Sequence, residues 1–294
     1  MMTGVQETIT DLAGTVGTAV VGVGRRRHVG SGIVIDKGTV LTNAHNIHSR
    51  QVTVTFADGR SATGDVKGVD TDGDIAVVAV DTQEVTPVVW STNEADLGSP
   101  VVGLSNPGGR GLRVTVGYVS SVDRSFRGPR GRRISGSIEH TAPLLPGSSG
   151  GPIVDEAGKL LGINTNRLGE GFYLAIAADA GLRSRTDKLA AGEAPQRHYL
   201  GVSVVPGFVA RKMRRAVGLP DTNGVLVRGV ADDGPAAAAG ITEGEMIVKV
   251  GDLDIAEVDD LHDALDAATA GEPIAVTVLR GIDEIELTVV LPKA

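Results

Sequence analysis

Between residues 18 and 178 the chain is a succession of short apolar runs, each ended by residues that favour turns. Such runs predict β-strands, which we place at residues 18–23, 32–35, 40–43, 52–56, 75–80, 101–104, 113–122, 137–142, 152–154, 159–164 and 171–176. Glycine supplies 41 of the 294 residues, so tight turns are plentiful. Many short strands without intervening helices are typical of β-sandwiches and paired β-barrels. We therefore expect a mainly β fold in this part of the chain.

The last hundred residues mix both kinds of element. Strands are predicted at 200–204, 225–230, 246–250, 274–280 and 284–291, and helices at 209–217 and 258–268. A helix over residues 179–191 and a polar segment that holds Pro195 precede this module, and domain boundaries fall in such segments. We therefore expect a β domain over residues 1–192, a linker over 193–197 and a small α+β domain over 198–294.

Composition and charge exclude several classes of protein and site. Cysteine is absent, so disulfides, thiolate metal sites and cysteine nucleophiles are excluded. The net charge is −8, divided as −1 on residues 1–195 and −7 on residues 196–294, which argues against nucleic-acid binding. The sequence has no apolar run of about 18 residues that could span a membrane.

An apolar stretch over residues 12–24 follows acidic Glu7 and Asp11 and precedes three arginines. This charge order is the reverse of the order in a secretory signal. A cytoplasmic location is therefore expected, and a periplasmic or other extracytoplasmic location is the alternative if a leader has been removed.

The sequence around Ser149, Gly147-Ser148-Ser149-Gly150-Gly151-Pro152, consists mostly of small residues. A nucleophilic serine needs backbone N–H groups directed at the developing oxyanion and no side chain that blocks the substrate carbonyl. Glycines on both sides of Ser149 satisfy this requirement, and the N–H groups of Gly147 and Ser149 are candidate donors. The alternative is a plain glycine-serine turn between two strands.

A serine hydroxyl becomes a strong nucleophile when a histidine, oriented by a buried carboxylate, accepts its proton. His45 is the best of six candidates because it lies just past the apolar strand over residues 40–43. The other five lie in polar stretches, near the linker or on the polar side of a helix: His28, His48, His140, His198 and His262.

Three aspartates compete for the carboxylate role. Only Asp74 directly precedes the apolar strand over residues 75–80, which can bury it, whereas Asp70 and Asp72 are expected to be solvated turn residues. The resulting order His45, Asp74, Ser149 is that of chymotrypsin-type enzymes and differs from the order in subtilisins and α/β-hydrolases. Three weak indications in this order, on a β background, predict a catalytic triad.

Three segments resemble the HtrA (DegP/DegS-like) family of ATP-independent serine proteases: residues 30–46 (GSGIVIDKGTVLTNAHN), 73–80 (GDIAVVAV) and 146–154 (PGSSGGPIV). The similarity extends from about residue 15 to residue 292, because the second module resembles that family's PDZ domain. The resemblance implies a chymotrypsin-like double β-barrel followed by a PDZ domain. It also implies that His45 is the general base, Asp74 its orienting carboxylate and Ser149 the nucleophile.

Further site residues are implied by the same resemblance. The oxyanion hole would be formed at Gly147, Ser148 and Ser149. The walls of the primary specificity pocket would be formed by Leu144, Leu145, Asn166, Arg167 and Leu168.

The chain departs from the family pattern at three positions. Asn46 stands where Val is usual, and Ser148 stands where Asn is usual. Arg167 is unusual in a pocket that prefers small or medium apolar side chains. Neither of the first two departures removes a catalytic atom.

In the second module, Tyr199-Leu200-Gly201-Val202 matches the carboxylate-binding loop of the family's PDZ domain. Successive backbone N–H groups can hold a C-terminal carboxylate there while the strand that follows pairs with the peptide. A glycine in the loop avoids a Cβ clash with the carboxylate. Leu261 and Leu265 are expected to line the ligand pocket or to lie in the core. An ordinary domain-opening strand is the alternative for the loop.

Ten residues between two expected strands hold five arginines: Arg124, Arg127, Arg130, Arg132 and Arg133. In the resembling family this region is a regulatory loop. Like charges at this density predict a mobile, solvated loop, and contact with the acidic second module is the alternative.

The sequence therefore predicts an ATP-independent serine endopeptidase that cleaves unfolded or damaged proteins, binds peptide C-termini and uses neither a metal nor a cofactor. The resemblance implies a homotrimer, although residues 1–20 lack the aromatic side chains that family trimers commonly use at their interface. One alternative is a catalytically idle PDZ adaptor or chaperone that only binds polypeptides. Another is a narrowly specific processing protease.

Overall fold

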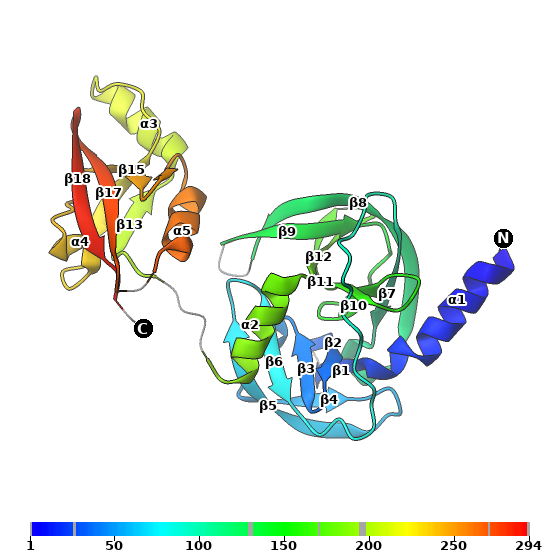
Figure 1. The fold of residues 1–294 in the computed structure, drawn as a ribbon. Helices are drawn as coiled ribbons and strands as arrows, with labels where there is room; N and C mark the ends of the chain where they lie inside the picture. Colours follow the sequence, from blue (N-terminus) through cyan, green and yellow to red (C-terminus); the bar gives the residue numbers. More distant parts are fainter. Residues whose placement is uncertain are drawn as a thin grey trace. The chain divides into compact units, whose positions relative to one another are not determined.

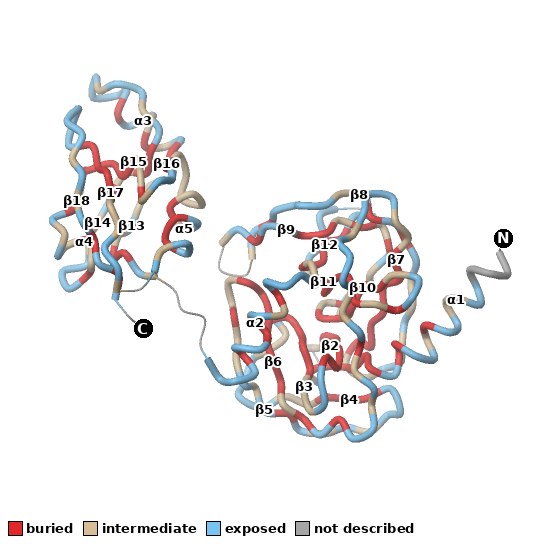
Figure 2. The backbone as a smooth tube through the Cα atoms, in the orientation of Figure 1, coloured by how far each residue is buried: buried red, intermediate tan, exposed pale blue. Residues whose placement is uncertain are grey.

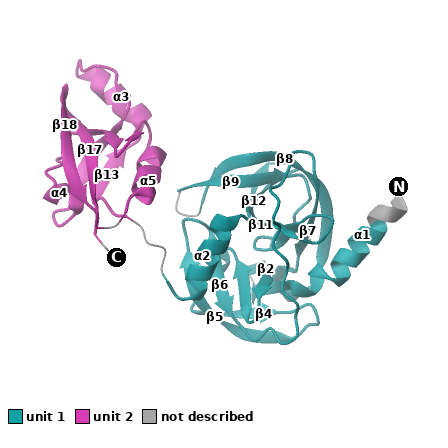
Figure 3. Cartoon of the chain, viewed as in Figure 1, with its two compact units in different colours: residues 1–195 teal, residues 196–294 magenta. Residues whose placement is uncertain are grey.

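The computed structural model describes residues 2–25, 28–128, 132–169, 171–193, 198–269 and 271–292. The chain divides into two compact units, residues 1–195 and residues 196–294 (Figure 3). Each unit has its own buried apolar core (Figure 2). Within the described ranges, no helix is both long enough and apolar enough to cross a membrane.

Unit 1 holds two closed antiparallel barrels of six strands each (Figure 1). The first barrel has the strand order β1-β2-β3-β6-β5-β4 and is formed by β1 (Val20–Arg25), β2 (His28–Asp36), β3 (Thr39–Thr42), β4 (Gln51–Thr55), β5 (Ser61–Asp70) and β6 (Ile75–Ala79). The second barrel has the order β10-β11-β12-β9-β8-β7 and is formed by β7 (Pro100–Ser105), β8 (Arg113–Arg127), β9 (Arg133–His140), β10 (Pro152–Val154), β11 (Leu160–Gly169) and β12 (Phe172–Ala177). The expected mainly β, double-barrel fold is thus confirmed.

Helices flank the barrels. Helix α1 (Met2–Gly14) and the 3₁₀ turn η1 (Val16–Ala19) precede β1, and α2 (Ala180–Ala190) follows β12. The 3₁₀ turns η2 (Ala44–Asn46) and η3 (Pro107–Gly109) follow β3 and β7. The Asp179 side chain caps α2 by accepting a hydrogen bond from the backbone N–H of Leu182 at 2.6 Å, as favoured at a helix N-cap.

The two barrels share one apolar core. It contains Ile33 and Leu41 from the first barrel and Leu104, Ile163 and Leu174 from the second, all of them fully buried. A second cluster, which includes Val101, Ile138 and Ala175, is formed by other side chains of β7–β12. Burying one such aliphatic side chain contributes about 1.5–3 kcal/mol, so this shared core holds the barrels together.

Strand β5 is absent from the strands expected from hydropathy. Its sequence, SATGDVKGVD, mixes polar and small side chains, and most of them are exposed or only half-buried. The strand nevertheless pairs with both β4 and β6, and it closes the first barrel. Backbone pairing rather than apolar patterning therefore defines this strand.

The arginine-rich segment is largely a paired hairpin, which corrects the expected loop. Strands β8 and β9 extend to Arg127 and Arg133, which are Cα partners across the pair. The Arg124 Nε lies 3.3 Å from Glu139 Oε2, so a carboxylate on the neighbouring strand offsets part of the positive charge. Residues 129–131, Arg130 among them, lie outside the described residues.

Unit 2 is a sheet with the order β13-β14-β15-β17-β18, and β16 pairs with β15. The strands are β13 (Val202–Val205), β14 (Val225–Val230), β15 (Met246–Val250), β16 (Leu253–Asp254), β17 (Pro273–Arg280) and β18 (Asp283–Val290). The helices are α3 (Gly207–Ala216), α4 (Pro235–Ala238) and α5 (Val258–Ala267). Leu261 and Leu265 of α5 are buried in the core of this unit.

Candidate active site

The turn that carries Ser149 lies between β9 and β10. The Ser148 N–H donates to the carbonyl of Leu145 at 3.1 Å, and Gly147 has a φ of +88°. Proline at the second position and a left-handed glycine at the third are typical of a type II turn. The dipeptide Pro146-Gly147 therefore fixes the backbone two residues before Ser149.

The backbone after Ser149 is equally constrained. Gly150 has a φ of +88°, and a Cβ placed on it would lie 2.1 Å from the carbonyl oxygen of Ser31. Such a contact excludes any side chain at this position, because heavy atoms do not approach so closely. The close approach brings the turn directly against β2 of the first barrel.

Two backbone N–H groups of the turn have no acceptor within the described part of the chain, those of Gly147 and Ser149. The carbonyl of Ser148 accepts the N–H of Gly151 at 3.0 Å. Since a trans peptide directs its N–H opposite to its carbonyl, the Ser149 N–H points away from Gly151. The N–H groups of Gly147 and Ser149 are therefore available to a ligand oxygen, whereas that of Ser148 is engaged within the turn.

His45 lies in η2, directly after β3, and its ring contacts a buried carboxylate. The Nδ1 atom is 2.9 Å from both carboxylate oxygens of Asp74, whose side chain is 2% exposed whereas that of His45 is 38% exposed. A neutral imidazole that donates Nδ1–H to a carboxylate keeps a lone pair on Nε2. The pair can therefore accept a proton at Nε2.

Asp74 is held in an unusual backbone conformation between β5 and β6. Its φ is +51°, a region that Asp and Asn enter more readily than most residues. The Asn43 side-chain amide donates to the Asp74 carbonyl at 2.9 Å, and the His45 N–H donates to the carboxylate at 3.2 Å. The Thr165 hydroxyl donates a short hydrogen bond to the other carboxylate oxygen. These hydrogen bonds hold the Asp74 backbone and both of its carboxylate oxygens in place beside the imidazole.

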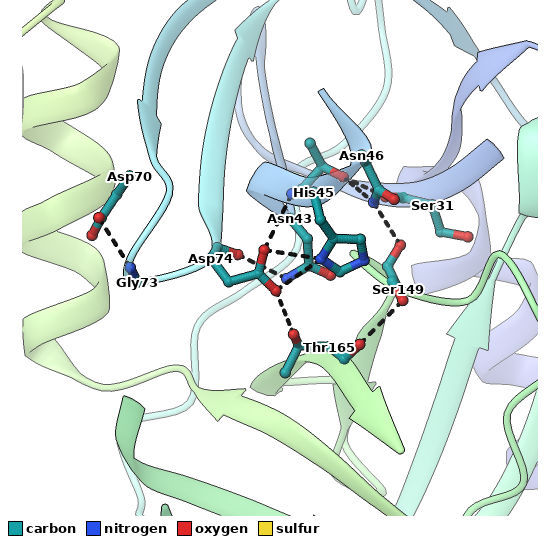
Figure 4. Close-up of polar contacts among 10 residues, drawn as sticks. Ser31, Asn43, His45, Asn46, Asp70, Gly73, Asp74, Ser149 and Thr165 are labelled. Carbon is teal, nitrogen blue, oxygen red and sulfur yellow. Dashed lines mark hydrogen bonds and ion pairs between the residues drawn. The ribbon is translucent and has the colours of Figure 1, made fainter. Parts of the chain in front are cut away.

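The interpretation of Asp70 as a solvated turn residue is wrong. Its residue exposure is 5%, and its carboxylate accepts the Gly73 N–H at 3.0 Å. Arg185 of α2 lies 3.8 Å from its other oxygen. Asp70 ends β5, the strand that hydropathy does not show, so its burial could not be expected. It shapes the turn that presents Asp74 (Figure 4).

Thr165, on β11, links the carboxylate to the serine. Its hydroxyl binds Asp74, and its carbonyl accepts the Ser149 hydroxyl at 3.2 Å. Figure 4 shows both contacts, with His45 beside them. Sequence reasoning missed Thr165. Its place at the end of an apolar strand, directly before the expected pocket segment 166–168, is the one indication that could have identified it.

The residues expected in the specificity pocket lie on two segments. Leu144 is half-buried, and the other four are exposed: Leu145, Asn166, Arg167 and Leu168. The Arg167 Nε donates to the carbonyl of Gly169 at 2.8 Å, and its guanidinium lies 5.9 Å from the centre of the Tyr173 ring. Arg167 is thus engaged by the end of its own strand, β11, and by an aromatic face.

The interpretation of His140 as part of a polar stretch is also wrong, because the residue is fully buried in the second barrel. Its Nε2 lies 2.9 Å from Asn164 Oδ1, and its ring stacks on Tyr173. Burial lowers the pKa of His140 to about 4, although the hydrogen bond to Asn164 acts in the opposite direction. His140 is therefore a neutral core residue at pH 7.

This burial makes unit 1 less stable in acid. The pKa is about 4 in the folded chain and about 6.5 in the unfolded chain, so the unfolded chain binds more protons between these values. The free energy of unfolding therefore falls as the pH drops from 6.5 to 4. His140 contributes about 3 kcal/mol to this decrease. His140→Gln replaces the ring N–H with an amide N–H donor that does not titrate, so this variant should lack that part of the decrease in stability. Urea unfolding at pH 7 and pH 4, followed by fluorescence of Trp90, measures it. Equal pH dependence in both proteins would exclude His140 as the cause.

In unit 2, the expected carboxylate loop precedes β13, which lies at one end of the sheet order. Leu200 is buried in the core, and its carbonyl accepts the Ala236 N–H at 2.9 Å. Gly201 has a φ of +83°, and its carbonyl accepts the Ala231 N–H at 2.8 Å. The loop is thus held by hydrogen bonds to other residues of unit 2. It adjoins β13, which has a pairing partner on one side only among the described residues.

Comparison with known proteins identifies a domain in each unit. Residues 30–163 match the trypsin-like peptidase domain, and residues 199–291 match the PDZ domain. The protein described as serine protease HhoB of Synechocystis sp. is 32% identical over 273 residues, which cover 87% of this chain and 64% of HhoB. HhoA of the same organism is 33% identical over 278 residues, which cover 88% of this chain and 69% of HhoA. The chain thus spans about two thirds of the length of these relatives.

Solved structures show the same architecture. The HtrA-type protease AlgW with a decapeptide has a TM-score of 0.81 at 24% identity, with 97% of this chain and 98% of AlgW covered, a likeness of fold. The serine endoprotease from Yersinia pestis has a TM-score of 0.76 at 27% identity, with 97% of this chain and 98% of that chain covered. With its trypsin-like peptidase domain, its PDZ domain and relatives of this similarity, the chain belongs to the HtrA family of serine proteases.

Proposed function

We propose that this chain is an ATP-independent serine endopeptidase in which Ser149 is the nucleophile, His45 the general base and Asp74 the carboxylate that orients it. The observation that carries the proposal is the buried Asp74 carboxylate 2.9 Å from Nδ1 of a partly exposed histidine, connected through Thr165 to a serine in a glycine-rich turn. Membership of a family of serine proteases supports it.

We propose the following role for each group. When a substrate carbonyl arrives, rotation about the Cα–Cβ bond moves the Ser149 hydroxyl from the Thr165 carbonyl to His45 Nε2. The hydroxyl oxygen attacks the carbonyl carbon as its proton passes to Nε2, and the imidazolium is stabilised by Asp74. The N–H groups of Gly147 and Ser149 bind the oxyanion. The imidazolium then protonates the leaving amine, and water releases the acyl group by the reverse steps.

Unfolded or damaged polypeptides are the substrates that we propose. The histidine ring and four of the five expected pocket residues are exposed, so an extended segment of chain can reach them. We place the walls of the primary pocket at Leu144, Asn166, Arg167 and Leu168. A narrowly specific processing protease would cleave one sequence in a peptide library and leave β-casein intact, whereas a quality-control protease would degrade casein at many sites.

The experiment that tests the proposal is labelling with a fluorophosphonate, which phosphonylates an activated serine. Mass spectrometry of the labelled protein should locate the phosphonate on Ser149. An idle PDZ adaptor would bind unfolded polypeptide without acquiring the label. If the protein binds unfolded polypeptide but takes no fluorophosphonate label, the protease assignment is contradicted and the adaptor is supported.

We further propose that the Tyr199–Val202 segment binds peptide C-termini, with the peptide adding a strand beside β13. The left-handed Gly201, the anchored Leu200 and the position of β13 in the sheet support this assignment. Backbone N–H groups of the loop would hold the carboxylate, and the strand edge would hold the peptide backbone.

Amidation of the peptide should weaken this binding at least about tenfold, because charge-assisted hydrogen bonds to a carboxylate are stronger than those to an amide. Calorimetry with the Ser149→Ala variant of the whole chain, which cannot consume the ligand, measures both affinities for peptides with an apolar C-terminal residue. Equal affinity of the acid and amide forms would rule out carboxylate capture.

A further inference from the structure

The peptide group between Ser149 and Gly150 is held from both barrels. The Gly150 N–H donates to the carbonyl of Asn164 on β11 at 2.8 Å. The Ser149 carbonyl accepts two hydrogen bonds from the first barrel, one from the Ser31 N–H at 2.9 Å and one from the Asn46 side-chain amide at 3.0 Å. The backbone of the nucleophile is therefore fixed at both ends of one peptide group.

The Asn46 side chain is itself held in a single orientation. Its Nδ2 also donates to the Thr42 hydroxyl at 3.0 Å, and that hydroxyl donates to the Ser31 carbonyl at 2.7 Å. A Cβ on Gly30 would lie 2.3 Å from Asn46 Cγ, so the amide packs directly on the glycine backbone. Since the Ser149 carbonyl can only accept, Nδ2 and not Oδ1 must face it. Figure 4 shows Asn46 extending from η2 to Ser149.

Asn46 directly follows His45 in the same 3₁₀ turn. One turn of chain thus carries the residue that contacts Asp74 and the residue that contacts the nucleophile's backbone. We propose that Asn46 is a positioning residue, which fixes Ser149 relative to His45 by donating to the Ser149 carbonyl. The inference rests on the proposed protease function. It assigns a role to a position at which the resembling family usually has Val, which has no donor.

The proposed role of Asn46 affects the reaction through the distance between the Ser149 hydroxyl and His45 Nε2. The hydroxyl must come within hydrogen-bond reach of Nε2 by rotation about one bond, so the position of the Ser149 Cα decides whether that rotation succeeds. Small displacements of reacting groups have large effects on rate. Loss of the Asn46 donor leaves the Ser31 donor in place, so the expected effect is partial and falls on the chemical step.

Two variants distinguish the effect of the Asn46 hydrogen-bond donor from the effect of the size of its side chain. Asn46→Val removes the donor, and Asn46→Asp keeps the shape of the side chain but replaces the donor with a carboxylate oxygen that faces the Ser149 carbonyl. We expect Asn46→Val to lower kcat and the phosphonylation rate about threefold to tenfold, with KM changed less than about twofold. Asn46→Asp should lower both rates more, by at least about tenfold, because two half-buried acceptor oxygens then face each other with no donor between them.

The measurements are kcat and KM on a peptide substrate, the phosphonylation rate of Ser149, and the thermal midpoint of unit 1 followed by Trp90 fluorescence. Asn93→Val, the same change at an exposed asparagine that is not among the candidate site residues, is the control and should behave as the parent. The proposal is overturned if Asn46→Val is phosphonylated at the parental rate, or if Asn46→Asp is the more active of the two. A fall in rate fully accounted for by unfolded protein would also overturn it. If the parent protein takes no label, the protease assignment itself fails, which is a distinct result.

Discussion

Ser149→Ala is expected to lower β-casein cleavage by at least about 10³-fold and to abolish fluorophosphonate labelling. Removal of a triad nucleophile leaves only substrate binding and oxyanion stabilisation, and in related chemistry this costs several orders of magnitude in kcat. Among the residues that the structure describes, the hydroxyl has one hydrogen-bond partner, the Thr165 carbonyl at 3.2 Å. The free energy of unfolding should therefore change by only about 1 kcal/mol. Casein degradation on gels and urea unfolding measure the two quantities.

The matched control is Ser184→Ala, the same change at an exposed serine of α2. It should leave cleavage and labelling at parental levels. Casein cleavage by Ser149→Ala at more than about one hundredth of the parental rate would contradict the assignment of Ser149.

Asp74→Asn is expected to lower kcat by about 10³–10⁴-fold, as loss of the orienting carboxylate does in comparable triads. The asparagine amide would donate to His45 Nδ1 and thereby place the ring proton on Nε2, where the serine proton must go. The fold should persist, because Asn tolerates the φ of +51° and the hydrogen bond from Asn43 goes to the backbone carbonyl. Steady-state kinetics on a peptide substrate measure the loss.

Asp65→Asn is the control for this change. Asp65 is exposed on β5 of the same barrel and accepts a hydrogen bond from Gln51, which an asparagine oxygen can also accept. It should retain parental kcat. An Asp74→Asn variant with parental thermal stability and more than about one tenth of the parental kcat would show that the carboxylate does not orient the base.

The fold class could be predicted because it depends on local pattern. Short apolar runs with turn residues between them define most of the barrel strands, and the apolar strand after Asp74 indicated its burial. Strand β5 was not predicted because its ten residues bury little apolar surface and are held by backbone pairing with β4 and β6. The burial of Asp70 was not predicted either, because its environment is formed in part by α2, more than a hundred residues later in the chain.

The parts of the candidate site that sequence could not supply all depend on contacts between distant segments. Thr165 contacts Asp74 from 91 residues away, and Asn46 contacts Ser149 from 103 residues away. Thr165 lies outside the quoted motifs, and Asn46 lies beside His45 in one of them, but neither residue type by itself indicates the contact it makes. His140 shows the opposite case, because its polar neighbours in sequence suggest exposure whereas the barrel buries it beside Asn164.

The double anchoring of the Ser149–Gly150 peptide group has a consequence for how the protein matures. Each barrel consists of consecutive strands, so each can close as its own part of the chain emerges during synthesis. The turn around Ser149 obtains its partners from both barrels, Ser31 on one side and Asn164 on the other. On the proposed function, we therefore expect a nascent chain with closed but undocked barrels to have no proteolytic activity. Fluorophosphonate added during refolding would time the docking of the barrels rather than their closure.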